Sequence, residues 1–190
     1  MPFTFPEGLA PEVYPLAWLV GRWTGGGVIK YEGIEETEFR QELVFDHDGG
    51  PYLRFESTLS VRSGASDGAV TDGEVGDDAA FDTVWSTETG YWRVASERPE
   101  GLSESQHPLE VLLTDASGRV ALFLGVVGDG RVDLATDFVA RTATAAEVTA
   151  AKRLYGNVDG RLLWVEELAA FGHPMGTYAS GELDRVTDDS

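Results

Sequence analysis

The sequence predicts an all-β protein, folded as a single closed antiparallel β-barrel of about ten strands in up-and-down order. The chain consists of short runs of alternating apolar and polar residues, which Gly, Asp and Pro interrupt at intervals of about ten residues. It contains no long stretch of helical periodicity. A glycine-rich run, residues 21–27, also opens the first expected strand. A β-sandwich built from similar strands is the alternative that this pattern leaves open.

The glycine-rich run has the form Gly-x-Trp-x-Gly-x-Gly, with Gly21, Gly25 and Gly27 at alternate positions around Trp23. Glycine usually weakens a strand, but the strands of a small barrel bend sharply, and glycine removes the Cβ that would clash at the bend. We therefore expect this run to form a bend, with Trp23 plugging one end of the barrel. A glycine-rich turn between unrelated strands is the other interpretation.

The first expected element is a short N-terminal helical turn over residues 15–20. Each expected strand is a short run bounded by turn residues. The ten ranges are 22–31, 37–46, 52–62, 83–96, 109–115, 119–127, 131–140, 147–158, 161–170 and 177–186.

The connections between these strands have the composition of tight hairpins. Glycine, Asn and Asp, which accept a positive φ, gather at residues 47–51, 115–118, 128–130 and 157–160. Hairpins of this kind join neighbouring strands in up-and-down order. Closing the resulting sheet removes its unpaired edges.

Length and composition favour one domain over residues 1–190, with an N-terminal extension at 1–15. Residues 63–80 are small, acidic and nearly free of large apolar side chains, so we expect them to form a flexible acidic loop between two strands. The spacing of its acids differs from that of an EF-hand calcium loop.

Charge and cysteine content restrict the partners and the cell compartment. The formal net charge of −19 opposes binding to nucleic acid or to an anionic membrane. There is no cysteine, and hence no disulfide framework and no thiolate nucleophile. The N-terminus has no basic and apolar signal pattern and the chain has no membrane-length apolar run, so a cytoplasmic protein is expected.

Several further segments accompany the glycine-rich run. They are residues 31–34 (Tyr-Glu-Gly-Ile), 41–55, 88–93 (Glu-Thr-Gly-Tyr-Trp-Arg), 153–155 (Arg-Leu-Tyr) and 172–178 (Gly-His-Pro-Met-Gly-Thr-Tyr). In order and spacing they resemble the nitrobindin family, over roughly residues 16–185. The resemblance implies a lipocalin-like barrel of the fatty-acid-binding-protein type. In haem-bearing members it also implies peroxynitrite isomerase activity.

The resemblance implies that an axial histidine in the last strand holds haem, in a pattern like G-x-P-L-x-x-H-L. Here Tyr178 stands at the histidine position, Ser86 at or near a distal-side histidine, and Gly33 at a family threonine. The sequence therefore resembles a ferric nitrobindin-like member that lacks the haem-ligating histidine. We expect no cofactor, no metal and no catalytic residues, so this reading leans against an enzyme. The alternative is a haem-binding isomerase with Tyr178 as axial ligand, because tyrosinate can ligate ferric haem.

The three histidines do not offer an obvious replacement ligand. His47 falls in an expected turn, His107 precedes a proline in a polar loop, and His173 stands at an expected strand end. A histidine without a partner motif is weak evidence for a ligand. We expect all three to be loop residues.

Polar candidates for the barrel interior are Arg93, Arg153, Tyr155, Tyr178 and Ser86. Arg153 and Tyr155 are two apart on one strand and so share a face. Facing inward, they could clamp the carboxylate of a fatty acid. Alternatively, Arg153 pairs with Glu166 or Glu167 on the next strand, because a buried charge needs a partner.

The leading functional hypothesis is a carrier or sensor that binds a small hydrophobic or amphiphilic molecule, such as a fatty acid, inside the barrel without chemistry of its own. The first competing hypothesis is the haem isomerase. The second is a protein with a filled interior that works through its surface, for which a homodimer is a possible assembly.

Overall fold

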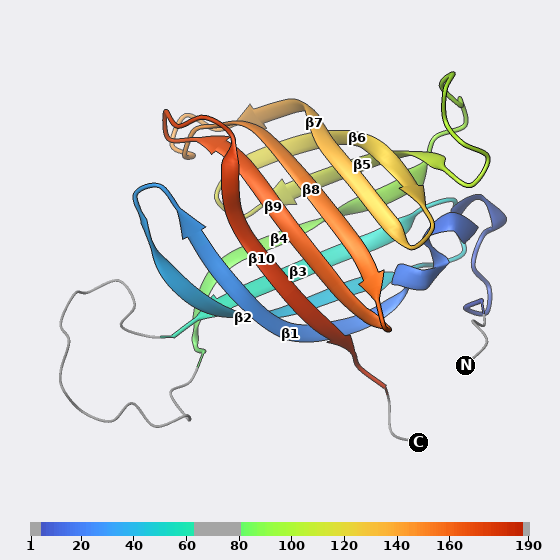
Figure 1. Cartoon of the computed structure of the whole chain (residues 1–190), viewed down its shortest axis with the longest axis horizontal. Helices are drawn as coiled ribbons and strands as arrows, with labels where there is room; N and C mark the ends of the chain where they lie inside the picture. The colour runs from blue at the N-terminus through green and yellow to red at the C-terminus, as the bar shows by residue number, and fades with distance from the viewer. Residues whose placement is uncertain (1–4, 63–80, 188–190) are drawn as a thin grey trace.

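The computed structural model describes residues 5–62 and 81–187, and the expected acidic loop at 63–80 lies outside these described residues. One 3₁₀ helix, η1 (Pro11–Leu19), precedes ten strands (Figure 1). The strands are β1 (Gly21–Tyr31), β2 (Ile34–Asp46), β3 (Leu53–Val61), β4 (Thr83–Val94), β5 (His107–Asp115), β6 (Arg119–Gly128), β7 (Arg131–Arg141), β8 (Val148–Val158), β9 (Arg161–Ala170) and β10 (Gly176–Arg185).

All ten strands belong to one closed antiparallel barrel in which every strand pairs with its neighbours in sequence and β1 pairs with β10. This confirms the predicted all-β barrel and excludes the sandwich. One glycine in each of the four predicted hairpins has a positive φ, as at Gly118 (φ 98°) and Gly160 (φ 85°). Within the described residues, no helix is long and apolar enough to cross a membrane.

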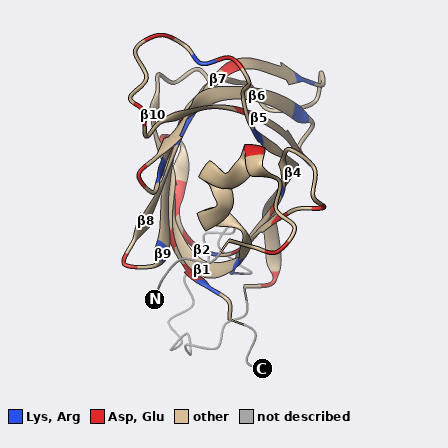
Figure 2. Ribbon diagram, turned by 90° about the vertical axis from the view of Figure 1, so that its right-hand side faces the viewer, with Lys and Arg blue, Asp and Glu red and all other residues tan. Residues whose placement is uncertain are grey.

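The helix η1 closes one end of the barrel and packs against β4 and β6. Figure 2 shows it inside the ring of strands. It begins earlier than the turn predicted at 15–20, at Pro11, whose fixed φ suits the first position of a helix. Its apolar side chains Val13, Leu16 and Leu19 are fully buried against the barrel interior.

Trp23 plugs this end, as predicted. Its side chain is fully buried, and its indole Nε1 donates a hydrogen bond of 2.8 Å to the carbonyl oxygen of Leu19 in η1. The guanidinium carbon of Arg185 lies 4.1 Å from the centre of the Trp23 ring, which is cation–π distance. The same Arg185 donates to the carbonyl oxygens of Trp18 and Val20, so it ties the last strand to the helix.

Gly25 and Gly27 of β1 are required by their close approach to β10 rather than by an unusual φ. A Cβ on Gly27 would lie 2.0 Å from the carbonyl oxygen of Ser180, and one on Gly25 would lie 2.2 Å from that of Glu182. Both distances are far below any real Cβ contact. The seam that closes the barrel therefore depends on the absence of side chains at these two positions.

We expect Gly27→Ala to lower the free energy of unfolding by about 1–3 kcal/mol, because the methyl group forces β1 and β10 apart. Gly156→Ala in β8 is the matched control, since a Cβ there meets no atom within 4 Å. Urea denaturation measures both variants. Equal stability of the two variants would contradict this account of the seam.

Candidate functional site

The interior divides into a packed half near η1 and a cavity of about 520 Å³ towards the opposite end. The packed half contains fully buried aromatic side chains, among them Trp92 and Phe45, whose ring centres are 5.0 Å apart. The cavity wall is mostly apolar. Its larger apolar side chains are Ile34, Phe55, Leu59, Val84, Trp85, Leu113, Phe123, Val139, Val148, Tyr155, Trp164, Leu168, Phe171 and Tyr178.

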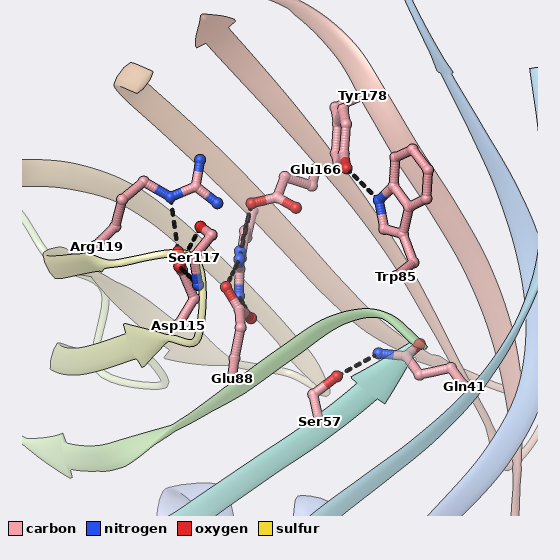
Figure 3. A network of polar contacts seen from close by, with 10 residues as sticks. Gln41, Ser57, Trp85, Glu88, Asp115, Ser117, Arg119, Glu166 and Tyr178 are labelled. Atoms are coloured by element: carbon pink, nitrogen blue, oxygen red, sulfur yellow. Dashed lines mark hydrogen bonds and ion pairs between the residues drawn. The ribbon is translucent and has the colours of Figure 1, made fainter. Parts of the chain in front are cut away.

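A buried ion pair crosses the barrel beside the cavity. Arg153 on β8 donates from Nη1 and Nη2 to the two carboxylate oxygens of Glu88 on β4, at 2.7 and 2.6 Å. Its Nε donates to Oε1 of Glu166 on the adjacent strand β9, at 2.8 Å. β4 and β8 are not neighbours in the barrel, so the bidentate pair spans the interior (Figure 3).

Burial and charge shift the pKa values of this group. Burial alone would lower the pKa of Arg153, but the charges of Glu166 and Glu88 outweigh it and raise that pKa above its usual value. Burial is the main cause that raises the pKa of Glu166; the charge of Arg153 opposes it and the nearby charge of Glu88 adds to it. Burial raises the pKa of Tyr155 to about 12, so its phenol is neutral at physiological pH.

Two β-bulges direct aromatic side chains towards each other at the cavity. Trp85 is an extra residue in β4: the residues before and after it pair with successive residues of β3, and Trp85 has no partner there. Tyr178 is the corresponding extra residue of β10 in its pairing with β9. The indole Nε1 of Trp85 donates to the hydroxyl of Tyr178 at 2.8 Å (Figure 3). Burial raises the pKa of the Tyr178 phenol, which therefore stays protonated at neutral pH.

Two further polar groups line the cavity, and sequence reasoning missed both. Trp164 Nε1 donates to Gln41 Oε1 at 2.7 Å, and Gln41 Nε2 donates to the Ser57 hydroxyl at 2.9 Å. This chain of hydrogen bonds satisfies side chains that are more than nine-tenths buried. Gly181 makes it possible, because a Cβ there would lie 2.6 Å from the Trp164 Nε1.

The second group lies at the hairpin between β5 and β6. Arg119 Nε donates to Asp115 at 2.7 Å, and the Ser117 backbone N–H donates to the same carboxylate at 2.8 Å. The Ser117 hydroxyl also donates to this carboxylate. Burial would raise the pKa of Asp115, but the hydrogen bonds from the Ser117 hydroxyl, Arg119 and the Ser117 N–H together lower it below its usual value. Among the described residues, the terminal nitrogens of Arg119 have no protein partner.

The structure brings four of the five predicted interior residues to the cavity, namely Ser86, Arg153, Tyr155 and Tyr178. Arg93 is a correction. Its side chain is 54% exposed on the outer face and pairs with Glu110 of β5 at 3.1 Å. Trp92 occupies the inward position of that strand, so its neighbour must point outward.

The carboxylate clamp predicted for Arg153 and Tyr155 also needs correction. Three of the Arg153 N–H donors already bind carboxylates of the protein, which is the structural alternative that the sequence left open. Of the two predicted partners, Glu166 makes the contact, while Glu167 lies on the opposite face of the strand. Glu88 was not predicted, because no pattern in the sequence shows that β4 faces β8 across the barrel.

None of the three histidines lines the cavity. His47 lies in the loop between β2 and β3, as expected, whereas His107 is the first residue of β5, so the expected loop position is wrong for it. His173 lies between β9 and β10, where its Nδ1 is 3.2 Å from Glu32 and its ring packs against Tyr31. Among the residues that the structure describes, no group of three or more acidic or histidine side chains is placed to hold a metal ion.

A closed ten-stranded barrel with a mainly apolar cavity at one end defines the class of small β-barrels that enclose a ligand. Within this class, residues 12–185 match the model of the THAP4-like, heme-binding beta-barrel domain, and the chain belongs to that family. The match supports the resemblance to nitrobindins found in the sequence.

Named relatives agree with this assignment. The chain is 44% identical to a "Ferric nitrobindin-like protein" of Beutenbergia cavernae, over 98% of this chain and 100% of the relative. It is 40% identical to a "Peroxynitrite isomerase" of Nocardioides sp., over 97% and 99% of the two chains. The crystal structure of Rv2717c from M. tuberculosis superposes with a TM-score of 0.72 at 29% identity, over 94% of this chain and 99% of that one.

The cavity does not fit a haem whose iron is held by an axial histidine, the ligand that the resemblance to nitrobindins implies. No imidazole, thiolate or thioether is among the described side chains that line it. The side chains of ligand type that remain are the phenols of Tyr155 and Tyr178, and burial raises the pKa of each. Iron ligation by tyrosine requires the deprotonated phenolate, which this environment disfavours.

We expect Arg153→Met to lower the free energy of unfolding by about 3–5 kcal/mol, because it leaves two buried carboxylates without a cation. Restoring neutrality with Glu88→Gln and Glu166→Gln in the same chain should recover part of the loss. Arg161→Met is the control, since Arg161 pairs with Asp184 on the outer face and is 45% exposed. Urea titration measures all of these variants, and equal losses for Arg153→Met and Arg161→Met would refute the buried bridge.

The raised pKa of Glu166 predicts a specific pH dependence. The Glu166 carboxyl binds its proton more tightly in the folded state than in the unfolded chain. Protonation of Glu166 therefore stabilises the fold fully below the unfolded pKa of about 4.3, and this stabilisation is lost as the pH rises through the folded pKa. The stability of wild type relative to Glu166→Gln should therefore fall as pH rises from 4.5 to 7.5. Urea titrations across that range check it, and a flat or rising difference would be the contrary result.

Proposed function

We propose that this protein binds a small hydrophobic or amphiphilic molecule in the barrel cavity and does so without haem. The observation that carries the proposal is a cavity of about 520 Å³ whose wall is apolar and aromatic and whose side chains of iron-ligand type are neutral phenols. Pockets of this size with a few fixed polar groups are typical of small-molecule sites. The protein would act as a carrier or sensor.

The arrangement of polar groups supports binding rather than catalysis. Glu88, Arg153 and Glu166 hold one another, and Gln41, Ser57 and Trp164 form a second closed set. Groups fixed in this way orient a ligand and exclude water, but they offer no nucleophile beside a base. The third hypothesis, a protein with a filled interior, is not favoured because side chains leave a cavity of about 520 Å³ inside the barrel.

The alternative function is peroxynitrite isomerase activity at a bound ferric haem. The family description and the names of relatives, including a "Peroxynitrite isomerase" of Clavibacter sepedonicus at 37% identity, favour it. For this chain it would require Tyr178 as the iron ligand. The raised pKa of that phenol weighs against this role.

We expect haemin added to the purified protein to give no saturable ferric Soret band near equal stoichiometry, because no lining side chain is a ready iron ligand. We expect native mass spectrometry of freshly purified protein to show a small organic adduct in place of haem. Tyr178→His restores an imidazole at the family position and should create a saturable Soret band.

Tyr178→Phe is the matched control, since it removes the hydroxyl without adding a nitrogen ligand. A wild-type protein that takes up haem stoichiometrically, and loses a tyrosinate charge-transfer band in Tyr178→Phe, would establish the alternative function. Wild-type protein that carries no adduct and binds no apolar probe would remove the carrier proposal as well.

A further inference from the structure

The ionisable side chains that line the cavity do not balance in charge. Three are carboxylates, Glu88, Asp115 and Glu166, and two are guanidinium groups, Arg119 and Arg153. Asp115 pairs with Arg119 and Glu88 pairs bidentately with Arg153. The described lining therefore has one carboxylate more than it has cations, and that carboxylate belongs to Glu166.

One oxygen of Glu166 has no partner among the described residues. Oε1 accepts from Arg153, whereas Oε2 accepts no hydrogen bond from any described residue. In Figure 3 this second oxygen points away from the ion pair. Glu166 is only 9% exposed and lines the cavity. Oε2 is itself accessible from the cavity, so a ligand or solvent there can supply the missing donor.

The terminal nitrogens of Arg119 are the competing site, and they would attract an anion. Three considerations oppose this. Asp115 already lies 2.7 Å from the Arg119 Nε, a bound anion would double the negative excess of the lining, and the net charge of −19 repels anions on approach. A cation would bring the lining to neutrality and would be attracted by the same field.

We propose that the cavity selects a ligand with a protonated nitrogen head, an alkyl or aryl ammonium, over the carboxylate with the same apolar body. The head donates to Oε2 of Glu166, and the body lies against the aromatic wall. Trp164 is two residues from Glu166 on the same face of β9, and such aromatic faces attract cations. This inference rests on the proposed function and specifies the class of ligand.

Calorimetric titration with octylamine, octanol and octanoate at pH 7.5 tests it. We expect octylamine to bind about tenfold more tightly than octanol, since a hydrogen bond between charged groups exceeds a neutral one by about that factor. We expect octanoate to bind more weakly than octanol. Glu166→Gln keeps an acceptor for Arg153, removes the negative charge, and should abolish the preference for octylamine over octanol.

Glu167→Gln is the matched control, because it removes the same charge from the neighbouring outward-facing position and should keep the preference. Octanol binding without preference for the amine, or octanoate binding as tightly as octylamine, overturns this inference and leaves the proposed function standing. Absence of binding by all three probes overturns both. Equal effects of the two glutamine variants would attribute the preference to net charge and would also overturn the assignment to Glu166.

Discussion

The interior of this barrel depends on the ion pair that Arg153 makes across it with Glu88 and Glu166. A guanidinium that is only 9% exposed is tolerated there because both of its edges meet carboxylates. The pair connects strands that are not neighbours, so it also fixes the distance between opposite walls. Packed aromatic side chains fill the barrel on the η1 side, and the cavity lies towards the other end.

This constraint shapes what the cavity can hold. Arg153 has no edge left for a ligand carboxylate. The polar groups that remain to contact a ligand are therefore Glu166 and the Trp85–Tyr178 pair at the two bulges. Trp85 and Tyr178 meet there because each is an extra residue in its strand, which turns its side chain out of the regular alternation. Tyr178 stands where the resemblance to nitrobindins implies a haem-ligating histidine, and it donates or accepts hydrogen bonds as a neutral phenol.

Much of the fold could be predicted from the sequence because it depends on local rules. Alternation and turn residues located all ten strands, and the glycine-rich run located the plug at Trp23. The site was harder, because its contacts depend on which strands face each other across the closed barrel. Glu88 could not be paired with Arg153 before it was known that β4 and β8 face each other across the closed barrel. Arg93 was a different error: alternation places Arg93 and Trp92 on opposite faces of β4, and the sequence did not show which of the two faces inward.

The central claim is that Arg153 bridges the interior, and nuclear magnetic resonance of its side chain tests this most directly. The account predicts a separate, slowly exchanging Arg153 Nε–H signal at neutral pH, because that proton is buried and bonded to Glu166. It also predicts cross-peaks from the guanidinium to side-chain protons of Glu88 on the opposite wall. A rapidly exchanging Nε–H without contacts to Glu88 would show that the bridge does not form in solution and would contradict the account.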